Sequence, residues 1–153
     1  MHYWLFKSEP TCFSIDDLSR QPKQIMHWDG VRNYQVRNMM RDEIKKGDHL
    51  FFYHSSCLPP GIVGIAEVVK EAYPDFTSWD IQSDHFDPKS TPENPRWLMV
   101  DIKLVKKFSR LISLEEIKHH SKLKNMQVTR KGNRLSITPV TPAEWKVIME
   151  MSA

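Results

Sequence analysis

Three short segments of the sequence combine aromatic rings with side-chain hydrogen-bonding groups. The longest runs from Trp28 to Asn38 and contains a Trp, a Gly, three side-chain amides and two Arg. The other two are Lys7–Pro10, written KSEP, and Phe52–Ser55, written FYHS. Aromatic side chains can stack on a planar ring, while hydroxyl, amide and imidazole groups can donate to or accept from its edge. These residue types predict a slot for a planar, polar ligand such as a nucleobase.

The five tryptophans divide into two groups by their surroundings. Trp4 and Trp145 lie on core-like periodicities, and we assign them to packing. Trp28, Trp79 and Trp97 each lie beside polar residues and can form walls of the slot. The alternative for any one of these three is that it covers an edge of the core.

Polar residues at predicted strand tips and turns would read the edge of the ligand. They supply both donors and acceptors, and the set is Ser8, Asn33, His54, Ser55 and Asp101. Taken one at a time, each is explained more simply by a hydrogen bond that stabilises a turn.

The sequence favours binding over catalysis. It contains no G-x-S-x-G, H-E-x-x-H, Walker or G-x-G-x-x-G motif. His54 and Ser55 are neighbours on a predicted strand, so their side chains point to opposite faces and are poor mutual partners. The seven His and two Cys lack the spacing of a metal site. We therefore expect no catalytic residue, metal or cofactor, and an enzyme acting on a nucleotide or modified base remains the alternative.

Charge is unevenly distributed along the chain. The formal net charge is +3, but ten Lys and Arg against two acidic residues fall between Lys103 and Arg134. Arg37, Arg41 and Lys45 also recur every four residues on a predicted helix. This pattern predicts one basic surface for an anionic partner, and a solvated basic face is the alternative.

The elements that must position these residues can be read from periodicity and caps. Asn33 is a suitable N-cap for a helix that starts at Tyr34 and ends near Lys45–Gly47. Residues 73–96 hold four Pro and no regular period, which predicts a long loop carrying aromatic residues. Further helices are expected at 14–18, at 113–119 and after the Thr141 cap, and strands at 2–7, 25–28, 49–56, 62–69, 96–106 and 134–138.

Strands and helices do not alternate as βαβ units. The order instead predicts a single α+β domain over 1–153, with a mostly antiparallel curved sheet or small barrel flanked by short helices. Two Cys give no disulfide framework, so we expect a reducing compartment, the cytoplasm. The N-terminus does not read as a signal peptide, and no apolar run reaches the ~20 residues of a membrane helix. A monomer with no membrane partner is expected.

Taken together, the motifs resemble the EVE domain family, to which the thymocyte nuclear protein family belongs. The resemblance rests on KSEP at 7–10, on W-x-GVRNYQVRN at 28–38, on FYHS at 52–55, on GIVGIAE at 61–67 and on PVT at 139–141. It covers nearly the full length in order. Val36 departs from the pattern, since members often carry Ala there, and it falls on the apolar face of the helix.

The resemblance implies a PUA-like fold, akin to the YTH domains that hold methylated adenine in an aromatic cage. It implies a non-enzymatic module that reads a modified nucleobase, and it leaves both DNA and RNA open as partners. By motif position the nucleobase site would comprise Ser8, Trp28, Gly30, Val31, Asn33, Tyr34, His54 and Ser55, with Trp79 as a cage wall from the loop. Lys7, Arg32, Arg37 and Arg41 would contact the nucleic-acid backbone.

Overall fold

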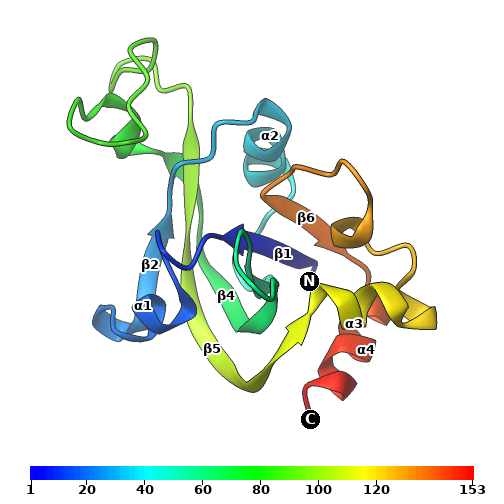
Figure 1. The fold of residues 1–153 in the computed structure, drawn as a ribbon. Helices are drawn as coiled ribbons and strands as arrows, with labels where there is room; N and C mark the ends of the chain where they lie inside the picture. Colours follow the sequence, from blue (N-terminus) through cyan, green and yellow to red (C-terminus); the bar gives the residue numbers. More distant parts are fainter.

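The computed structural model describes residues 1–153 and is built around one six-stranded sheet (Figure 1). Its strands are β1 (Tyr3–Ser8), β2 (Ile25–Trp28), β3 (His49–His54), β4 (Gly61–Pro74), β5 (Leu98–Ser113) and β6 (Ile137–Val140). Their spatial order is β2-β5-β4-β3-β1-β6. All neighbours are antiparallel except β1 and β3, which are parallel. The predicted α+β class with a mostly antiparallel sheet is confirmed.

Four α-helices begin where side-chain caps were expected. They are α1 (Ile15–Ser19), α2 (Tyr34–Asp42), α3 (Leu114–His119) and α4 (Pro142–Met151). Ser14, Asn33, Ser113 and Thr141 each accept a hydrogen bond from a backbone N–H in the first turn of the helix that follows. Four short 3-10 turns complete the list: η1 (Pro22–Gln24), η2 (Phe76–Trp79), η3 (Ser121–Leu123) and η4 (Gln127–Thr129).

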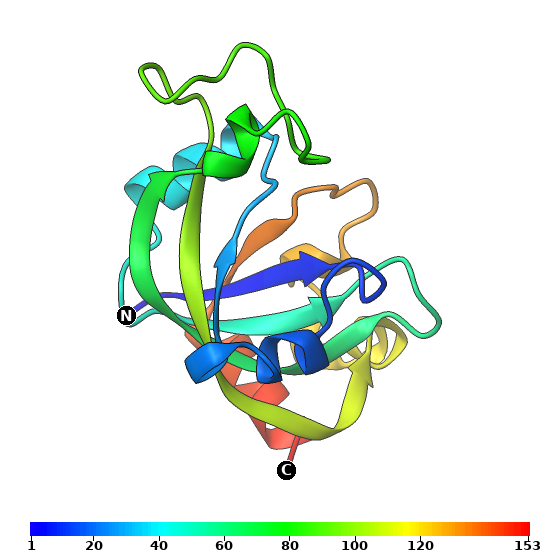
Figure 2. The same ribbon diagram turned by 90° about the vertical axis from the view of Figure 1, so that its left-hand side faces the viewer.

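The two longest strands curve the sheet. β4 and β5 span 14 and 16 residues, and their pairing shifts register at four places. Each shift bends the strands locally and increases their twist. Figures 1 and 2 show β5 running from the loop of residues 75–97, at one end of the molecule, around the sheet to α3.

The sheet buries apolar side chains on both faces. Trp4, Phe6, Leu50 and Phe52 belong to a cluster of 17 buried residues that α1 and α2 complete with Ile15, Leu18, Val36, Met39 and Met40. The alternate strand residues Leu5, Phe51 and Tyr53 belong to a second cluster of 12, which includes Ile117 of α3 and Ile148 of α4. Trp145 stacks on Phe51 with ring centroids 3.9 Å apart. The assignment of Trp4 and Trp145 to packing is therefore confirmed.

Several predicted boundaries are wrong. The helix α2 ends at Asp42 rather than near Lys45–Gly47, because the Lys45 N–H donates to the buried Asp48 carboxylate and Gly47 takes a positive φ. The last strand runs from Ile137 to Val140, not 134–138, since its antiparallel register with β1 covers Ile137 to Val140. Pro139 is tolerated there because β6 is an edge strand. Both β4 and β5 continue well past their predicted C-terminal ends.

Two further observations concern the whole chain. Cys12 and Cys57 are both free thiols. None of the helices combines the length and the apolar composition that crossing a membrane would require.

Candidate nucleic-acid interface

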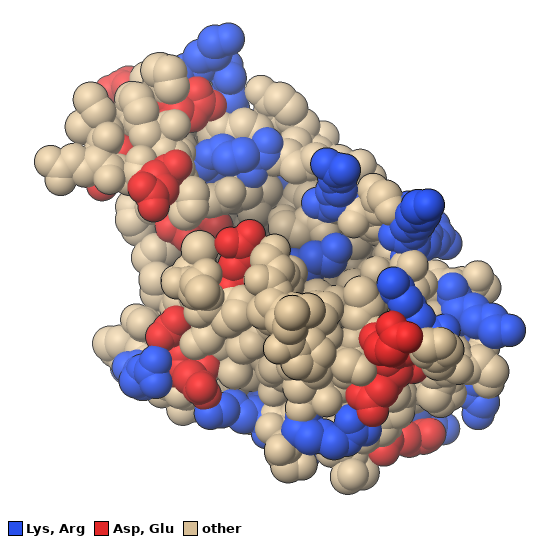
Figure 3. Space-filling model, in the orientation of Figure 1, with Lys and Arg blue, Asp and Glu red and all other residues tan.

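A cavity of about 400 Å³ opens where the end of β1, the end of β2 and the 75–97 loop meet. Figure 3 shows the surface hollowed between the lobe formed by that loop and the body of the molecule. Five of the thirteen lining residues are hydrophobic. The lining comprises Lys7, Ser8, Glu9, Cys12, Phe13, Met26, His27, Trp28, Asp29, Gly30, Val31, His85 and Ser136.

Trp28 joins this cavity to the core. It is 9% exposed and makes edge-to-face contacts with Phe6 and Phe52, at centroid distances of 5.2 and 5.6 Å. Strand β2 brings it there by pairing with β5, with Trp28 opposite Val100. A Trp held on several sides by other rings offers the cavity a rigid apolar surface.

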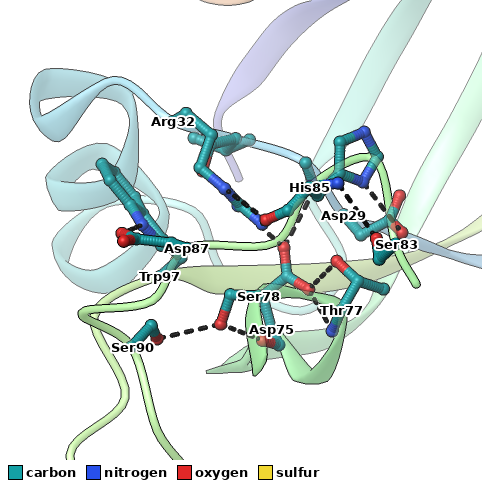
Figure 4. Close-up of polar contacts among 12 residues, drawn as sticks. Asp29, Arg32, Asp75, Thr77, Ser78, Ser83, His85, Asp87, Ser90 and Trp97 are labelled. Carbon is teal, nitrogen blue, oxygen red and sulfur yellow. Dashed lines mark hydrogen bonds and ion pairs between the residues drawn. The ribbon is translucent and has the colours of Figure 1, made fainter. Parts of the chain in front are cut away.

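The turn that follows Trp28 is fixed by a buried carboxylate from the 75–97 loop. Oδ2 of Asp75 accepts hydrogen bonds from the Gly30 N–H at 2.9 Å and from Nη1 of Arg32 at 3.1 Å. Its other oxygen accepts from the backbone N–H and the hydroxyl of Thr77 (Figure 4). Burial alone would raise the pKa of Asp75, but the bonds from Thr77, Gly30 and Arg32 outweigh it and hold the pKa below its ordinary value.

Two imidazoles flank the carboxylate of Asp29 at the cavity. Nδ1 of His85 lies 3.6 Å from its Oδ2, and Nε2 of His27 lies 3.8 Å from the same oxygen. His85 comes from the 75–97 loop, and its backbone carbonyl accepts from Nε and Nη2 of Arg32 (Figure 4). The 75–97 loop and the turn after Trp28 are thus joined at two points of the loop, Asp75 and His85.

The 75–97 loop is ordered by its own anchors. The Asp75 N–H donates to the Trp97 carbonyl at 2.9 Å, which closes the loop at its base. Trp97 is buried, and its Nε1 donates to Asp87 at 2.7 Å. The Ser78 and Ser90 hydroxyls bond each other inside the loop. The third slot candidate, Trp97, therefore serves as the anchor of this loop.

The structure brings together some of the sequence-predicted site residues and separates others. Ser8, Trp28, Gly30, Val31 and Lys7 all line the cavity. Five others do not: Asn33, Tyr34, His54, Ser55 and Trp79.

Each of the residues outside the cavity has another placement. The Asn33 side chain caps α2, and Tyr34 stacks on Trp97 with centroids 4.8 Å apart. Ser55 lines a second groove that shares only Lys7 with the cavity. Trp79 lies at the end of η2, in the 75–97 loop.

His54 faces α1. Its Nε2 accepts a hydrogen bond from the Ile15 N–H at 3.1 Å. Burial lowers the pKa of His54, against the opposing influence of Asp16 and Asp17, and this favours the neutral form that the hydrogen bond needs.

The arginines predicted to meet the nucleic-acid backbone have internal partners. Arg32 bonds Asp75 and two backbone carbonyls. Arg37 bonds the Asn38 side chain and the Arg96 carbonyl and lies over the Tyr34 ring. Arg41 forms a two-point ion pair with Asp42. Among the four predicted backbone contacts, only Lys7 lies at the cavity.

Sequence reasoning missed eight residues of the lining. Glu9 and Asp29 lie inside the KSEP and Trp28–Asn38 segments, and His27 directly precedes Trp28, so their position in the sequence was an available signal. Cys12, Phe13 and Met26 carried a weaker signal of the same kind. His85 and Ser136 had none, because only the folded chain brings them to this point.

This fold and this cavity define a class. The chain belongs to the EVE domain family, whose model matches residues 2–151. The sheet and helices described above are the EVE/PUA-like fold.

Individual relatives are similar over nearly the whole chain. Thymocyte nuclear protein 1 of Gallus gallus is 46% identical over 97% of this chain and 68% of its own length. A protein from Pseudomonas putida has a crystal structure that superposes with a TM-score of 0.93, at 45% identity and 99% coverage of both chains. The human THYN1 protein was crystallised in complex with 5-methylcytosine-containing DNA; it has a TM-score of 0.92 and 44% identity, and covers 99% of this chain and 98% of its own.

Proposed function

We propose that this protein is a non-enzymatic reader that binds DNA carrying a modified base, with 5-methylcytosine as the leading candidate. The observation that carries the proposal is the cavity lined by Trp28. It occurs in a chain 44% identical to a relative that was crystallised with such DNA. A cavity of about 400 Å³ falls in the range of small-ligand sites and has room for one base.

The apolar part of the lining suits a methyl group. Phe13, Met26 and Val31 lie around the same cavity as Trp28. Burying one methyl carbon contributes about 0.8 kcal/mol, which corresponds to about a fourfold gain in affinity. The methyl group alone therefore gives a modest preference over unmodified cytosine.

The polar part of the lining is rich in acceptors. Glu9 and Asp29 contribute carboxylates, and the Ser8 hydroxyl already donates its hydrogen to the Phe13 carbonyl at 2.6 Å. Carboxylates accept from the N4 amino group of cytosine, whereas the O4 of thymine offers only another acceptor. We infer a preference for bases that carry an exocyclic amino group.

Turnover has less support. His54 is the residue that could act as a general base. Its Nε2 accepts a hydrogen bond from the Ile15 N–H, and it lies outside the cavity lining. The Cys12 thiol lies at the cavity but donates to the Glu9 carboxylate, whereas reactive thiols occupy electropositive surroundings. We also propose a reducing compartment for this protein, either the cytoplasm or the nucleus after which its relatives are named.

The direct test is fluorescence anisotropy with matched oligonucleotides that differ at one base. Cytosine, 5-methylcytosine, thymine and adenine would be compared in DNA, and cytosine and 5-methylcytosine in RNA. We expect 5-methylcytosine DNA to bind about fourfold more tightly than cytosine DNA, and thymine to bind more weakly than either. Tighter binding of the RNA series would reassign the partner, and no base preference in either series would overturn the proposal.

Two variants isolate the cavity. Cys12 is exposed at its lining, so Cys12→Trp should obstruct it without disturbing the core and should abolish the base preference. The neighbouring Thr11 is exposed but outside the lining, so Thr11→Trp adds the same bulk and should leave the preference intact.

A duplex offers a further test, because a paired base must leave the stack to enter a cavity. That costs a few kcal/mol, and less for a mismatched base. Placing a mismatch opposite 5-methylcytosine should therefore raise affinity about tenfold or more. Equal affinity for matched and mismatched duplexes would mean that the base is recognised while it stays stacked and paired in the duplex.

A further inference from the structure

A second groove, of about 590 Å³, lies beside the cavity and shares Lys7 with it. Its residues come from the end of β1, from the end of β3 and the connection to β4, from α3, and from η4 and the connection between η4 and β6. They are Lys7, Tyr53, Ser55, Ser56, Pro60, Leu114, Lys118, Val128, Thr129, Arg130, Lys131 and Asn133.

The groove is positively charged throughout. Lys7, Lys118, Arg130 and Lys131 line it, and no Asp or Glu does. None of these four cations forms an ion pair within the protein. Figure 3 shows Lys and Arg gathered on the corresponding side of this face, over β6 and the connection that precedes it.

Other cations of the basic segment 103–134 are placed differently. Lys107 pairs with Asp16 of α1, and Arg110 pairs with Glu116 of α3. Lys103 and Lys106 are exposed on β5 and line neither the cavity nor the groove. The basic segment is thus divided by the fold, and only part of it forms a groove.

Neutral donors accompany the charge. Ser55 and Ser56 bring hydroxyl groups to the groove, whereas the hydroxyl of Thr129 donates to the Met126 carbonyl at 2.7 Å. Tyr53 adds a phenolic hydroxyl, and burial, with a smaller contribution from Cys57, raises its pKa further above neutrality, to about 12. Cationic and hydroxyl donors without carboxylates are the side chains that bind phosphate oxygens.

Lys7 links the two sites. It follows the buried core of β1, and burial lowers the pKa of its ammonium group, which has no acidic partner. A phosphate at this position would supply the missing negative charge between a base in the cavity and a backbone in the groove.

We propose that this groove binds the sugar-phosphate backbone of the strand whose modified base enters the cavity, with Lys7 beside the phosphate of that nucleotide. The proposal rests on the proposed function for the base and adds the path of the chain. It names Lys118, Arg130 and Lys131, rather than Arg32, Arg37 and Arg41, as the phosphate contacts.

The experiment measures two independent readouts on single-stranded oligonucleotides. The ratio of affinities for 5-methylcytosine and cytosine strands reports the cavity. The slope of log affinity against log salt reports the phosphates neutralised, at about 0.7 per contact. Lys118→Gln/Arg130→Gln is compared with Lys103→Gln/Lys106→Gln, which removes the same charge from exposed positions outside the groove.

We expect the groove variant to lower the slope by about 1.4 and the affinity about 25-fold at about 0.1 M salt, with the base ratio unchanged. The control variant should keep the wild-type slope. All four side chains belong to exposed residues, so unfolding midpoints should match the wild type.

The outcomes separate the two claims. Equal changes of the salt slope in both variants, or no change of the slope in the groove variant, would overturn the groove assignment. If the ratio of affinities for 5-methylcytosine and cytosine were retained, the proposed function would still stand. If 5-methylcytosine and cytosine strands bound equally well, the reader function would be rejected. A salt slope lowered only in the groove variant would still support the groove as a backbone site.

Discussion

The imidazole of His85 lies so close to the α-carbon of Gly30 that a β-carbon at position 30 would fall 2.6 Å from its Nε2. The 75–97 loop therefore rests directly on the turn after Trp28. Gly30 also has φ +79°, a conformation that L-residues with a side chain adopt only at a cost. Both facts make glycine the fitting residue at this point of the cavity lining.

Gly30→Ala is expected to destabilise the protein by about 1–2 kcal/mol from the backbone conformation alone, with an added cost from displacing His85. Urea unfolding of Gly30→Ala, made in the wild type and in His85→Ala, separates the two contributions. The substitution should cost less when the imidazole is absent. An equal cost in both backgrounds would show that His85 moves aside freely.

Asp75→Asn should be among the more damaging single changes. Asp75 is fully buried and receives bonds from Gly30, Arg32 and Thr77, so removing its charge leaves Arg32 uncompensated. We expect a loss of about 3 kcal/mol in the free energy of unfolding. Asp80→Asn, at an exposed position of the same loop, should cost under about 1 kcal/mol. Similar losses for the two variants would contradict this role for Asp75.

The pH dependence of stability should include a contribution from His54. Its folded-state pKa is lowered by burial from its ordinary 6.5, so the unfolded chain binds the proton more readily. The stability that His54 contributes is therefore present above 6.5 and is lost as pH falls through its lower folded-state pKa.

In His54→Gln this part of the acid sensitivity should disappear. Denaturant midpoints at about pH 7.5 and about pH 5.5 should fall less in the variant than in the wild type. Because carboxylates titrate alike in both proteins, the comparison isolates the imidazole. An identical decline would show that His54 does not titrate differently on unfolding.

Trp28 and Trp79 should behave differently when replaced. Trp28→Ala removes a ring packed on Phe6 and Phe52, and we expect a loss of about 3–5 kcal/mol in stability together with weaker DNA binding. Trp79 does not line the cavity, so Trp79→Ala should change affinity less than about twofold.

Stability and affinity must be measured on both variants, since a destabilised Trp28→Ala can be assayed for binding only where it remains folded. A tenfold loss of affinity in Trp79→Ala would restore that residue as a stacking wall.

Local sequence signals predicted the elements well because caps and periodicity act over a few residues. Asn33 and Thr141 were found in this way, and both cap the expected helices. Strand ends were less predictable, since β5 continues through Lys106 and Lys107, where β4 pairs with it, and on to Ser113.

The cavity was predictable only in part. Trp28 and Ser8 do line the cavity, but Trp97 has the same polar surroundings in sequence and anchors a loop. Arg32 looked free for phosphate until folding brought Asp75, 43 positions later, against its guanidinium. The residues next to a side chain in the sequence do not show whether it will contact a ligand or a distant part of its own chain.

The position of β1 between β3 and β6 has a consequence for synthesis. Translation delivers β1 first, yet its two partners arrive from the middle and from the far end of the described chain. Folding from the N-terminus during synthesis therefore cannot complete this sheet. A nascent chain paused before Ile137 would leave the hydrophobic strand of Trp4, Leu5 and Phe6 with an open edge that can pair with other chains. Protection of this edge by chaperones at the ribosome should therefore matter until β6 has been made.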